Sequence, residues 1–572
     1  MKVAIEGCCH GELDDIYGSI RLIEQRDNIK IDLVLICGDF QSVRNEADAI
    51  CMSVPAKYRQ LGTFWKYYSG REKAPYPTVF IGGNHEASNY LWELYHGGWV
   101  CDNIYYMGYA NVIRFGGLRI GGLSGIYKSY HYDKGHYETS PYSEDHKKSA
   151  YHYRKYDVEK LLHVQEPLDI FMSHDWPRGI ERYGNLKKLM REKKFFINEI
   201  MSNSLGSEPN FQLLAKLKPS YWFSAHLHVH YAALVDHSML EKGEYPEGIQ
   251  ALLKGKYPPS ASASTPRVKN EDEIVIDVRL DIDSEAKPEE TSNESTADDD
   301  NSNGSTNRNV NTSSASTYEG GIQIEQNKDA DAVNDGQSMA SVSLNTSISP
   351  KYTKFLSLDK CLPGRKFLQI LDIPSPNDDN QDYDFYYDME WLAITRALHP
   401  FLSTTYQQAH IPFTDDELQN RIAEERRFLE TKQQSGILDL KIPHNFEPTA
   451  PAYNPEMLPT NPQLIKECQH PFLNPQTAKF CEEIGIENKI NSGCRQTLQL
   501  SEHENSAPIT DMRSTYPETS TVEQSSNHNS RCIDTTESFE VPSTKRTKIE
   551  ERDVVAAARN PSEIMMDDEE FM

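Results

Sequence analysis

Five short polar motifs in the first half of the chain carry side chains that can bind metal ions. They are Cys8-Cys9-His10, Gly38-Asp39, Gly83-Asn84-His85-Glu86, Ser173-His174-Asp175 and Ala225-His226-Leu227-His228. Thiolate, imidazole, carboxylate and amide oxygen groups are all metal ligands in proteins. Together they supply enough ligands for two cations about 3.5–4 Å apart, with Asp39 able to bridge them and with positions left for water and a phosphate.

The five motifs each follow a short apolar run of strand length. The runs are Val3–Glu6, Leu33–Cys37, Val79–Ile81, Ile170–Met172 and Trp222–Ser224. Helical stretches such as Asn45–Tyr68 and Ser88–Tyr95 lie between them, and Ile113–Leu123 resembles a tight hairpin. This alternation predicts an α/β fold in which the motifs gather at the carboxyl ends of strands.

Side-chain direction selects among the candidate ligands. In an extended segment, residues i and i+2 point to the same side. Cys8 and His10 are therefore expected to converge, as are His226 and His228, whereas Cys9 points away. Each motif alone is weak, since a lone histidine in a loop is more often structural and Gly-Asp is often a turn. The set of five, each after a strand, is much more specific.

Composition divides the 572 residues into two parts. Residues 1–236 hold 28 Lys+Arg and 28 Asp+Glu, whereas the rest holds 31 against 58 and carries the whole net charge of −27. The neutral, aromatic-rich first part can bury a core, while much of the acidic second part cannot. We therefore predict a catalytic domain at 1–236, a linker and disordered acidic Ser/Asn-rich insertion at 237–350, a smaller α/β module at 351–433 and a disordered tail at 434–572.

The smaller module carries its own folding signals. Phe367–Ile373 is a strand candidate that is expected to extend the first domain's sheet. Met389–Phe401 and Asp415–Gln433 are predicted helices, the second with a capping box formed by Thr414 and Glu417.

Several classes of protein are disfavoured. The acidic balance argues against nonspecific nucleic-acid binding through total charge. There is no secretory signal pattern and no apolar run near the roughly 20 residues of a membrane span, so no membrane association is expected. The ten cysteines show no paired framework, which indicates reduced thiols in the cytosol or nucleus. Lys545-Arg546-Thr547-Lys548 is a candidate nuclear-import patch, although such short runs are common by chance.

The motif set resembles the calcineurin-like metallophosphoesterases, whose pattern is D-x-H, G-D, G-N-H-[DE], H and G-H-x-H. Cys8 stands where Asp is usual, and Ala225 where Gly is usual, which puts an ordinary protein phosphatase in doubt. The sequence is similar in these places to one branch, the RNA lariat debranching enzymes. The likeness spans 1–236 and, more weakly, 351–410, and it includes Gly7-Cys8-Cys9-His10-Gly11-Glu12-Leu13-Asp14, Gly38-Asp39-Phe40-Gln41, Gly83-Asn84-His85-Glu86-Ala87-Ser88-Asn89-Tyr90, Ser173-His174-Asp175-Trp176-Pro177 and Ser224-Ala225-His226-Leu227-His228-Val229.

This resemblance implies a four-layer α/β/β/α sandwich. It also implies hydrolysis of the 2′–5′ phosphodiester bond at the branch point of excised intron lariats, by in-line attack of a metal-bound hydroxide, which linearises introns for turnover. One metal site would comprise Cys8, His10, Asp39 and His228, and the other Asp39, Asn84, His174 and His226. The cofactors are expected to be two divalent cations, Fe²⁺, Zn²⁺ or Mn²⁺, and the Cys8 thiolate suits zinc or ferrous iron.

His85 is adjacent to the ligand Asn84 but belongs to neither predicted metal site. It fits a general acid that protonates the leaving 2′-oxygen. The alternative is that His85 only orients neighbouring ligands.

The tyrosine- and histidine-rich segment 124–156 is the candidate RNA-recognition loop, as the resemblance also implies. Aromatic rings can stack on splayed bases while cations meet phosphates. Its alternative is a loop that only packs over the sheet. The predicted RNA contacts are Lys128, Tyr132, His136 and Arg154.

Branched intron lariat RNA is the expected partner. The expected location of the protein is the nucleus, and shuttling to the cytoplasm is left open by the sequence. The tails leave two alternatives open: they bind splicing or intron-turnover proteins, or they only solubilise and localise the enzyme. DNA is not an expected partner. Two rival functions stay open: another metallophosphoesterase, such as a 3′–5′ nuclease or a protein phosphatase, and a non-catalytic RNA-binding scaffold.

Overall fold

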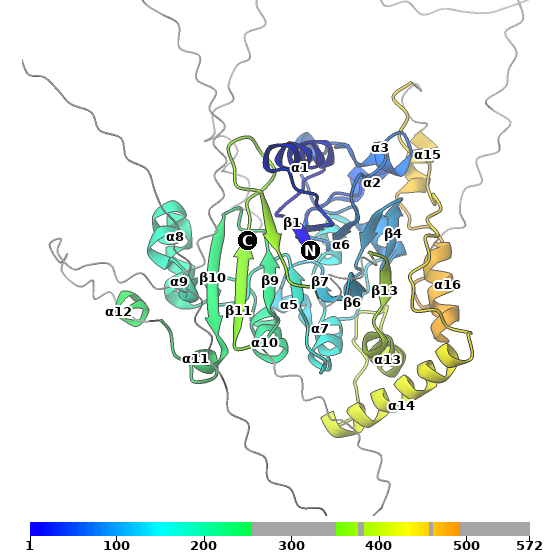
Figure 1. Ribbon diagram of the computed structural model, residues 1–572. Helices are drawn as coiled ribbons and strands as arrows, with labels where there is room; N and C mark the ends of the chain where they lie inside the picture. Colours follow the sequence, from blue (N-terminus) through cyan, green and yellow to red (C-terminus); the bar gives the residue numbers. More distant parts are fainter. Residues whose placement is uncertain (247, 254–349, 376–382, 457–461, 492–493, 495–572) are drawn as a thin grey trace, which may run out of the picture. The chain divides into compact units, whose positions relative to one another are not determined.

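The computed structural model describes residues 1–246, 248–253, 350–375, 383–456, 462–491 and 494. Most of the predicted acidic insertion, the far end of the predicted tail and the basic run at 545–548 lie outside these ranges. Within them, the strands form one sheet of order β12-β1-β2-β3-β5-β4 and a second of order β10-β11-β9-β8-β7-β6-β13 (Figure 1).

The strand bounds agree with the five predicted runs to within one residue at each end. The first sheet holds β1 (Lys2–Glu6), β2 (Leu33–Ile36), β3 (Thr78–Phe80), β4 (Gly98–Cys101), β5 (Ile104–Tyr106) and β12 (Leu368–Asp372). The second holds β6 (Ala110–Phe115), β7 (Leu118–Leu123), β8 (Ile170–Ser173), β9 (Tyr221–Ser224), β10 (Tyr231–Asp236), β11 (Tyr352–Ser357) and β13 (Phe385–Tyr387).

The alternation of side chains along each strand builds the layers. Val3 and Ile5 of β1 belong to a core shared with strands of the second sheet, whereas Ala4 joins a different core with helical residues. Because successive strand residues face opposite sides, each sheet has one face against the other sheet and one against helices. This confirms the predicted four-layer α/β/β/α sandwich.

Helices cover the two outer faces. On the first sheet, the core includes residues of α1 (Leu13–Asp27), α2 (Glu46–Cys51), α3 (Phe64–Tyr68) and α4 (Ser88–Glu93). On the second sheet, the core includes residues of α7 (Lys155–Leu162), α8 (Leu186–Glu192), α9 (Ile197–Ser202), α10 (Glu208–Leu217), α13 (Met389–Leu398) and α14 (Asp415–Gln434). None of the described helices combines the length and apolar character that a bilayer crossing requires.

Local sequence explains where several elements begin and end. The predicted hairpin is confirmed, because β6 and β7 are joined by Gly116 and Gly117, both at positive φ as a tight turn requires. The capping box of Thr414 and Glu417 at the start of α14 is also confirmed. The single helix predicted over Asn45–Tyr68 is wrong: α2 ends before Pro55, a 3-10 turn covers Ala56–Tyr58, and α3 starts after Gly62.

The segment after residue 350 is part of both sheets rather than a separate module. β11 lies between β10 and β9, and β12 pairs with β1. The prediction that this segment extends the first domain's sheet is thus confirmed, while the predicted domain boundary at 236 is corrected. Residues 1–236 alone would lack β11 from inside the second sheet, and the described residues belong to one compact unit. The start of the predicted linker contains α11 (His237–Glu241) and α12 (Ile249–Leu253).

The predicted disordered tail is wrong for its first part. Residues 434–456 and 462–491 are described and contain α15 (Pro462–Cys468) and α16 (Pro475–Ile484), which Figure 1 shows in yellow and orange. Their buried apolar residues, Phe472 and Phe480 among them, pack on the first 236 residues and on α13. Sparse apolar residues between prolines hid this segment, because this strap is irregular outside its two short helices.

A buried ion-pair network fastens that strap. The Arg44 guanidinium donates to Asp48, Glu93 and Thr449, and lies 3.9 Å from the centre of the Tyr90 ring. Arg44 follows the metal-motif residue Asp39 by five positions, so the C-terminal strap supports the loop that carries this carboxylate. An ion pair buried this completely is costly to break from one side.

Candidate metal centre

All five motifs meet at the carboxyl ends of β1, β2, β3, β8 and β9, as predicted. One ligand atom from each of Cys8, His10, Asp39 and His228 lies within 4.8 Å of the others. The His10 and His228 Nε2 atoms are 3.4 Å apart, and His10 Nε2 is 3.7 Å from Asp39 Oδ2. These four residues, which we call the first cluster, are the predicted ligands of the first metal site.

His174, a predicted ligand of the second site, faces the other oxygen of the same carboxylate, and the other ligands predicted for that site lie beside His174. His174 Nε2 lies 3.3 Å from Asp39 Oδ1 and 3.2 Å from Asn84 Oδ1. The His226 ring lies beside that of His174, with centroids 5.0 Å apart. Asp39 therefore faces one group with each oxygen, which is the geometry of a bridging carboxylate.

The backbone reaches this arrangement by a route that the sequence did not predict. His10, Asp39, His226 and His228 all have positive φ, between 46° and 61°. Left-handed conformations in non-glycine residues are strained and cluster at functional sites. The expectation of extended segments with alternating side chains is thus wrong for His226 and His228, although Cys8 and His10 do converge and Cys9 does point into the helix-side core.

Two glycines allow the loops to approach closely. A Cβ on Gly83 would lie 2.2 Å from Asp39 Oδ1, and one on Gly38 would lie 2.2 Å from His174 Nδ1. Neither contact is sterically possible, so the glycine of each motif has a physical role. The second nitrogen of His174, Nδ1, is 2.8 Å from the Cys37 carbonyl, which fixes Nε2 toward Asp39 and Asn84.

Glu86 ties the loops after β2 and β3 together. Its carboxylate accepts hydrogen bonds from the backbone N–H groups of Gly83, Phe40 and Gln41. Burial, together with the nearby Asp39, raises the pKa of Glu86 to about 8. The Gln41 amide lies 3.2 Å from His10 Nδ1 and orients that ring. Neither residue had a role predicted from the sequence, although Glu86 stands inside one of the five motifs.

The electrostatics of the histidines suit metal binding. Burial lowers the pKa of His10 and of His226 to about 3, so both imidazoles are neutral near physiological pH. A neutral imidazole is the form that binds metal ions. Burial opposes ionisation of Asp39, but His174 and His85 hold its pKa well below the ordinary value.

The residues present fit a pair of cations. The Oδ2 atom of Asp39 is buried and has no hydrogen-bond partner among the described residues, and it faces the first cluster. Burial raises the pKa of the Cys8 thiol, and the negative Asp39 adds to this. A dication at the first cluster would satisfy the orphaned oxygen and favour the thiolate.

His85 lies at the edge of the first cluster. Its ring centroid is 5.5 Å from that of His10, and its Nδ1 atom is buried without a hydrogen-bond partner among the described residues. Its backbone N–H donates to Asp39 Oδ1 at 2.8 Å, which holds the residue beside the bridging carboxylate. The ring is thus next to the centre but outside the first cluster.

The candidate recognition segment 124–156 is anchored to the same loops. The Tyr127 N–H donates to Asp175, next to His174, and the Gly125 N–H donates to the Gly82 carbonyl, near Asn84. The segment is not one irregular loop, since it contains α5 (Ser129–Tyr132), α6 (Glu144–Ala150) and the first residues of α7.

Two of the four predicted RNA contacts are corrected. Arg154 is completely buried and its guanidinium donates to Glu138 and to backbone carbonyls. His136 is 3% exposed, and its Nε2 lies 3.0 Å from the buried carboxylate of Asp157. Both side chains hold the segment together and cannot reach RNA. Lys128 is exposed, and Tyr132 is half-buried against the second sheet's core.

Two exposed aromatic side chains lie close together here, one from this segment and one from the C-terminal part of the chain. Tyr130 is 68% exposed and Tyr406, from the C-terminal part, is 47% exposed. Lys134 lies between them, with its ammonium 5.8 Å and 4.4 Å from the two ring centres. Backbone pairing of Lys134 with Gln407 joins the two chain segments. Sequence reasoning missed Tyr406 because it lies 272 positions after Lys134 in a segment without a motif.

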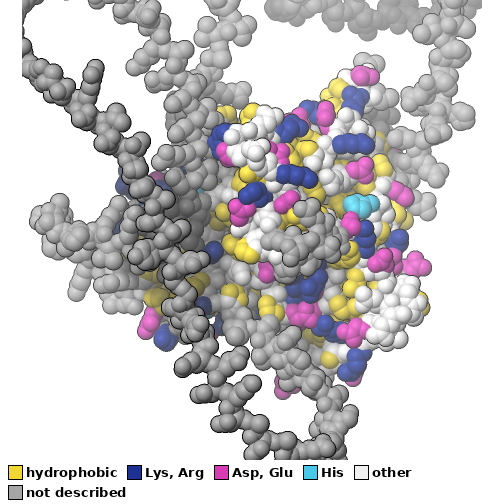
Figure 2. Space-filling model, in the orientation of Figure 1, with side chains coloured by type: hydrophobic (Ala, Val, Ile, Leu, Met, Phe, Trp, Pro, Cys, Tyr) yellow, Lys and Arg dark blue, Asp and Glu magenta, His cyan; other side chains and the backbone are white. Residues whose placement is uncertain are grey.

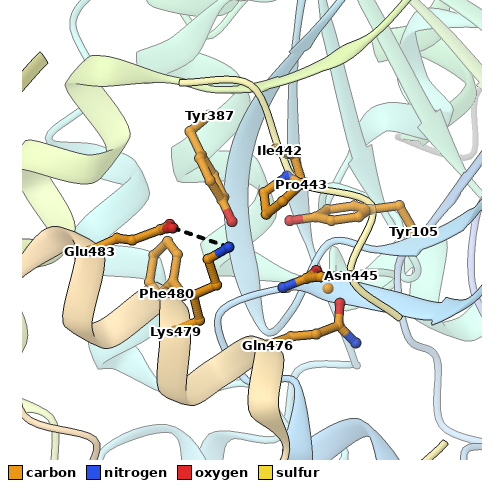
Figure 3. A pocket seen from close by; sticks show the side chains of 11 residues that line it. Tyr105, Tyr387, Ile442, Pro443, Asn445, Gln476, Lys479, Phe480 and Glu483 are labelled. Carbon is orange, nitrogen blue, oxygen red and sulfur yellow. Dashed lines mark ion pairs between the residues drawn. The ribbon is translucent and has the colours of Figure 1, made fainter. Parts of the chain in front are cut away.

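A pocket elsewhere carries none of these groups. Figure 3 shows it between β4, β13 and α16, lined by Tyr105, Tyr387 and Gln476, with an ion pair of 3.7 Å between Lys479 and Glu483. None of the described residues that line it belongs to the five motifs. A second, shallower pocket lies between Gly83 and Tyr151, where segment 124–156 meets the metal loops.

Comparison with known proteins supports the interpretation of this site. The family model for the calcineurin-like phosphoesterase matches residues 1–230, and the one for the lariat debranching enzyme C-terminal domain matches residues 350–489. The chain is 41% identical over 490 residues to lariat debranching enzyme A of Xenopus laevis, covering 85% of this chain and 70% of that one.

Similar values hold across distant organisms. Identity is 40% to the lariat debranching enzyme of Arabidopsis thaliana, over 86% of this chain and 88% of the relative. It is 39% to that of Schizosaccharomyces pombe, over 86% of this chain and 96% of the relative. Identity of this extent, over both the metal loops and the C-terminal strands, shows that this chain belongs to the lariat debranching enzyme family.

Proposed function

We propose that this protein is a metal-dependent phosphodiesterase that hydrolyses the 2′–5′ bond at the branch point of intron lariat RNA. The observation that carries the proposal is the position of Asp39, with one oxygen 3.7 Å from His10 of the first cluster and the other 3.3 Å from His174, which lies beside Asn84. Family membership makes this protein a phosphodiesterase hydrolase, and the cluster supports its dependence on divalent metals.

Each group of residues has a distinct task in this reaction. Two divalent cations, when bound, would supply Lewis acidity toward the phosphoryl group and lower the pKa of a bound water to about 7. The two groups of ligands would hold them through Asp39. Hydrogen bonds to the Glu86 carboxylate hold together the loops that carry Asp39 and Asn84. His85 is placed to give a proton to the leaving 2′-oxygen.

Metal identity follows from ligand type. The first cluster includes a thiolate donor, Cys8, which favours zinc or ferrous iron. The second has oxygen and nitrogen donors only and accepts iron, zinc or manganese. We propose Fe²⁺, Zn²⁺ or Mn²⁺ as the occupants.

The proposal predicts a specific pattern of cleavage. A synthetic branched RNA should be converted to a linear product by the purified full chain, whereas linear 3′–5′ RNA of the same sequence should stay intact. A chelator should abolish cleavage, and Mn²⁺, Zn²⁺ or Fe²⁺, tested separately, should restore it. Products resolved by denaturing electrophoresis give the measurement.

Other outcomes select other functions. Cleavage of the linear RNA at a similar rate would identify a 3′–5′ nuclease. Binding of branched RNA without turnover in any metal would identify a scaffold.

We also propose that Tyr130, Tyr406 and Lys134 bind an unpaired part of the RNA. Exposed rings stack on bases of any sequence, and an ammonium between them can meet a phosphate. The segment is tied to the loops of Asn84 and His174, so the rings lie on a structure that continues from the metal centre. The splayed nucleotides around a branch suit such recognition.

Replacing both rings, in Tyr130→Ala/Tyr406→Ala, should raise KM for branched RNA about tenfold or more, because stacking contributes about 1–3 kcal/mol per base. Hydrolysis of bis(4-nitrophenyl) phosphate, which is too small to reach the rings, should be unchanged. Tyr352→Ala is the control, since Tyr352 is also exposed beside a lysine but lies on β11. Equal losses on both substrates would show that the rings only support the fold.

Location and partners are further proposals. A role in intron turnover requires access to spliced RNA, so we propose a nuclear location. The basic run at 545–548 and the tail after residue 494 lie outside the described residues. DNA lacks the 2′-linked branch, so it is not a proposed substrate.

A further inference from the structure

The loop between β11 and β12 carries positive charge to the metal centre, and it belongs to a segment that the sequence did not connect with the site. Residues 358–367 form this loop, which contains Lys360, Arg365 and Lys366. In Figure 1 it rises at the end of the sheets where β1 leads toward α1. Its place is fixed by contacts with the loop of Cys8.

Three backbone hydrogen bonds join the two loops. The Gly7 N–H donates to the Phe367 carbonyl, the Cys8 N–H to that of Asp359, and the Cys361 N–H to that of Cys8. Cys8 and Lys360 form a parallel bridge. Bridged strands lie about 4.8 Å apart, so the Lys360 backbone is a direct neighbour of a predicted metal ligand. A Cβ on Gly7 would lie 2.2 Å from the Asp359 carbonyl oxygen, so this contact requires glycine.

The backbone bridge places the Lys360 side chain on the side of the first cluster. Residues paired across neighbouring strands point to the same side, and the partner of Lys360 is Cys8, a residue of the first cluster. Lys360 is half-buried. Lys360 thus lies beside Cys8, at the edge of the metal centre.

The charged residues of this loop differ in whether they form ion pairs. Arg365 is paired with Asp359 at 3.2 Å, but neither Lys360 nor Lys366 has a carboxylate partner among the described residues. The exposed Lys366 lies across the loop, where its carbonyl accepts the N–H of Asp359, the residue before Lys360. Elsewhere, on the face shown in Figure 2, Lys and Arg side chains are mixed with Asp and Glu.

We propose that Lys360 and Lys366 form a phosphate-binding rim beside Cys8 at the edge of the metal centre, and that Lys360 contacts the phosphate next to the branch on one strand of the RNA. A lysine without a carboxylate partner beside a phosphodiesterase centre can pair with a phosphate of the substrate. The scissile phosphate belongs at Asp39, so the neighbouring phosphate is the group that reaches Lys360. This inference rests on the proposed function and names the part of its substrate that the rim holds.

The test compares Lys360→Ala and Lys366→Ala with wild type on branched RNA at several salt concentrations. We expect KM to rise about tenfold for Lys360→Ala, as for removal of a charge-assisted hydrogen bond. The salt dependence of binding should flatten by about 0.7 in log–log slope for each phosphate that the variant no longer neutralises. Lys360→Arg should keep most of the affinity, and turnover of bis(4-nitrophenyl) phosphate and metal content should not change.

Lys354→Ala is the matched control, because Lys354 is an exposed lysine on β11 that faces Tyr221, six residues before Lys360. A second RNA with an uncharged methylphosphonate next to the branch tests the interaction itself. The affinity of wild type should fall as much on this RNA as the affinity of Lys360→Ala falls on ordinary RNA. Lys360→Ala should bind the methylphosphonate RNA only slightly more weakly than it binds ordinary RNA.

The outcomes separate the rim from the function. If wild type fails to cut branched RNA, the proposed function is wrong. If wild type cuts it but Lys360→Ala behaves like Lys354→Ala, the rim is wrong. The rim is also wrong if the loss of affinity caused by Lys360→Ala and the loss caused by the methylphosphonate add in the combined experiment. An equal loss of activity on bis(4-nitrophenyl) phosphate would indicate damage to the metal centre and would overturn the rim as well.

Discussion

Asp39→Asn is expected to lower turnover of branched RNA by at least about 10³-fold, because it removes the charge and one of the two oxygens that join the clusters. One Asp39 oxygen lies 3.7 Å from His10 Nε2 and the other 3.3 Å from His174 Nε2. An asparagine amide offers a single neutral oxygen, so it can serve only one of the two groups. Metal content, measured on the same sample, should fall below that of wild type.

The fold should survive this substitution. Asp39 Oδ1 accepts the N–H of His85, and an asparagine oxygen can keep that bond. Circular dichroism and the thermal midpoint should therefore match wild type. Asp102→Asn, an exposed turn carboxylate, serves as the control and should keep full activity. Full metal content together with normal turnover in Asp39→Asn would contradict the bridging role.

His85→Ala is expected to lower turnover of branched RNA by at least about 10²-fold while metal content stays at the wild-type value. The 2′-oxygen is a poor leaving group unless it gains a proton, and His85 lies beside the first cluster without being one of its four residues. The buried Nδ1 atom, which has no partner among the described residues, shows that the ring is not fully satisfied by this part of the protein.

A second substrate separates proton donation from ligand support. Nitrophenolate leaves readily without protonation, so His85→Ala should lose far less activity on bis(4-nitrophenyl) phosphate than on RNA. His85→Gln, which keeps a hydrogen-bonding side chain but cannot act as an acid, should be as impaired on RNA as His85→Ala. Lost metal in either variant would instead assign His85 to the coordination of the cations.

Much of the site could be predicted because each motif follows directly from its strand. A parallel strand delivers the residues after it to one edge of the sheet, so five strand–motif pairs in order were enough to predict a shared centre. The structure confirms the convergence of Cys8, His10, Asp39 and His228. Cys9 joins the helix-side core, in agreement with its predicted orientation away from the site.

Side-chain roles in the recognition segment could not be predicted in the same way. Arg154 and His136 have the residue types of RNA contacts, yet the fold buries both against Glu138 and Asp157. Whether a charged residue pairs within the protein or faces solvent depends on partners that are distant or irregularly spaced in the chain. Residue type alone therefore identified candidates but not exposure.

The amino-acid sequence by itself determined which residues can bind metal, which strands precede them and that these strands alternate with helices. Those features depend on neighbours along the chain and on the period of a strand or helix. Only the tertiary structure decided that β11 lies inside the second sheet, that Lys360 and Tyr406 come beside residues hundreds of positions earlier, and that residues 434–456 and 462–491 pack on the core. Such contacts are chosen by packing and backbone pairing between distant segments, and no local pattern encodes them.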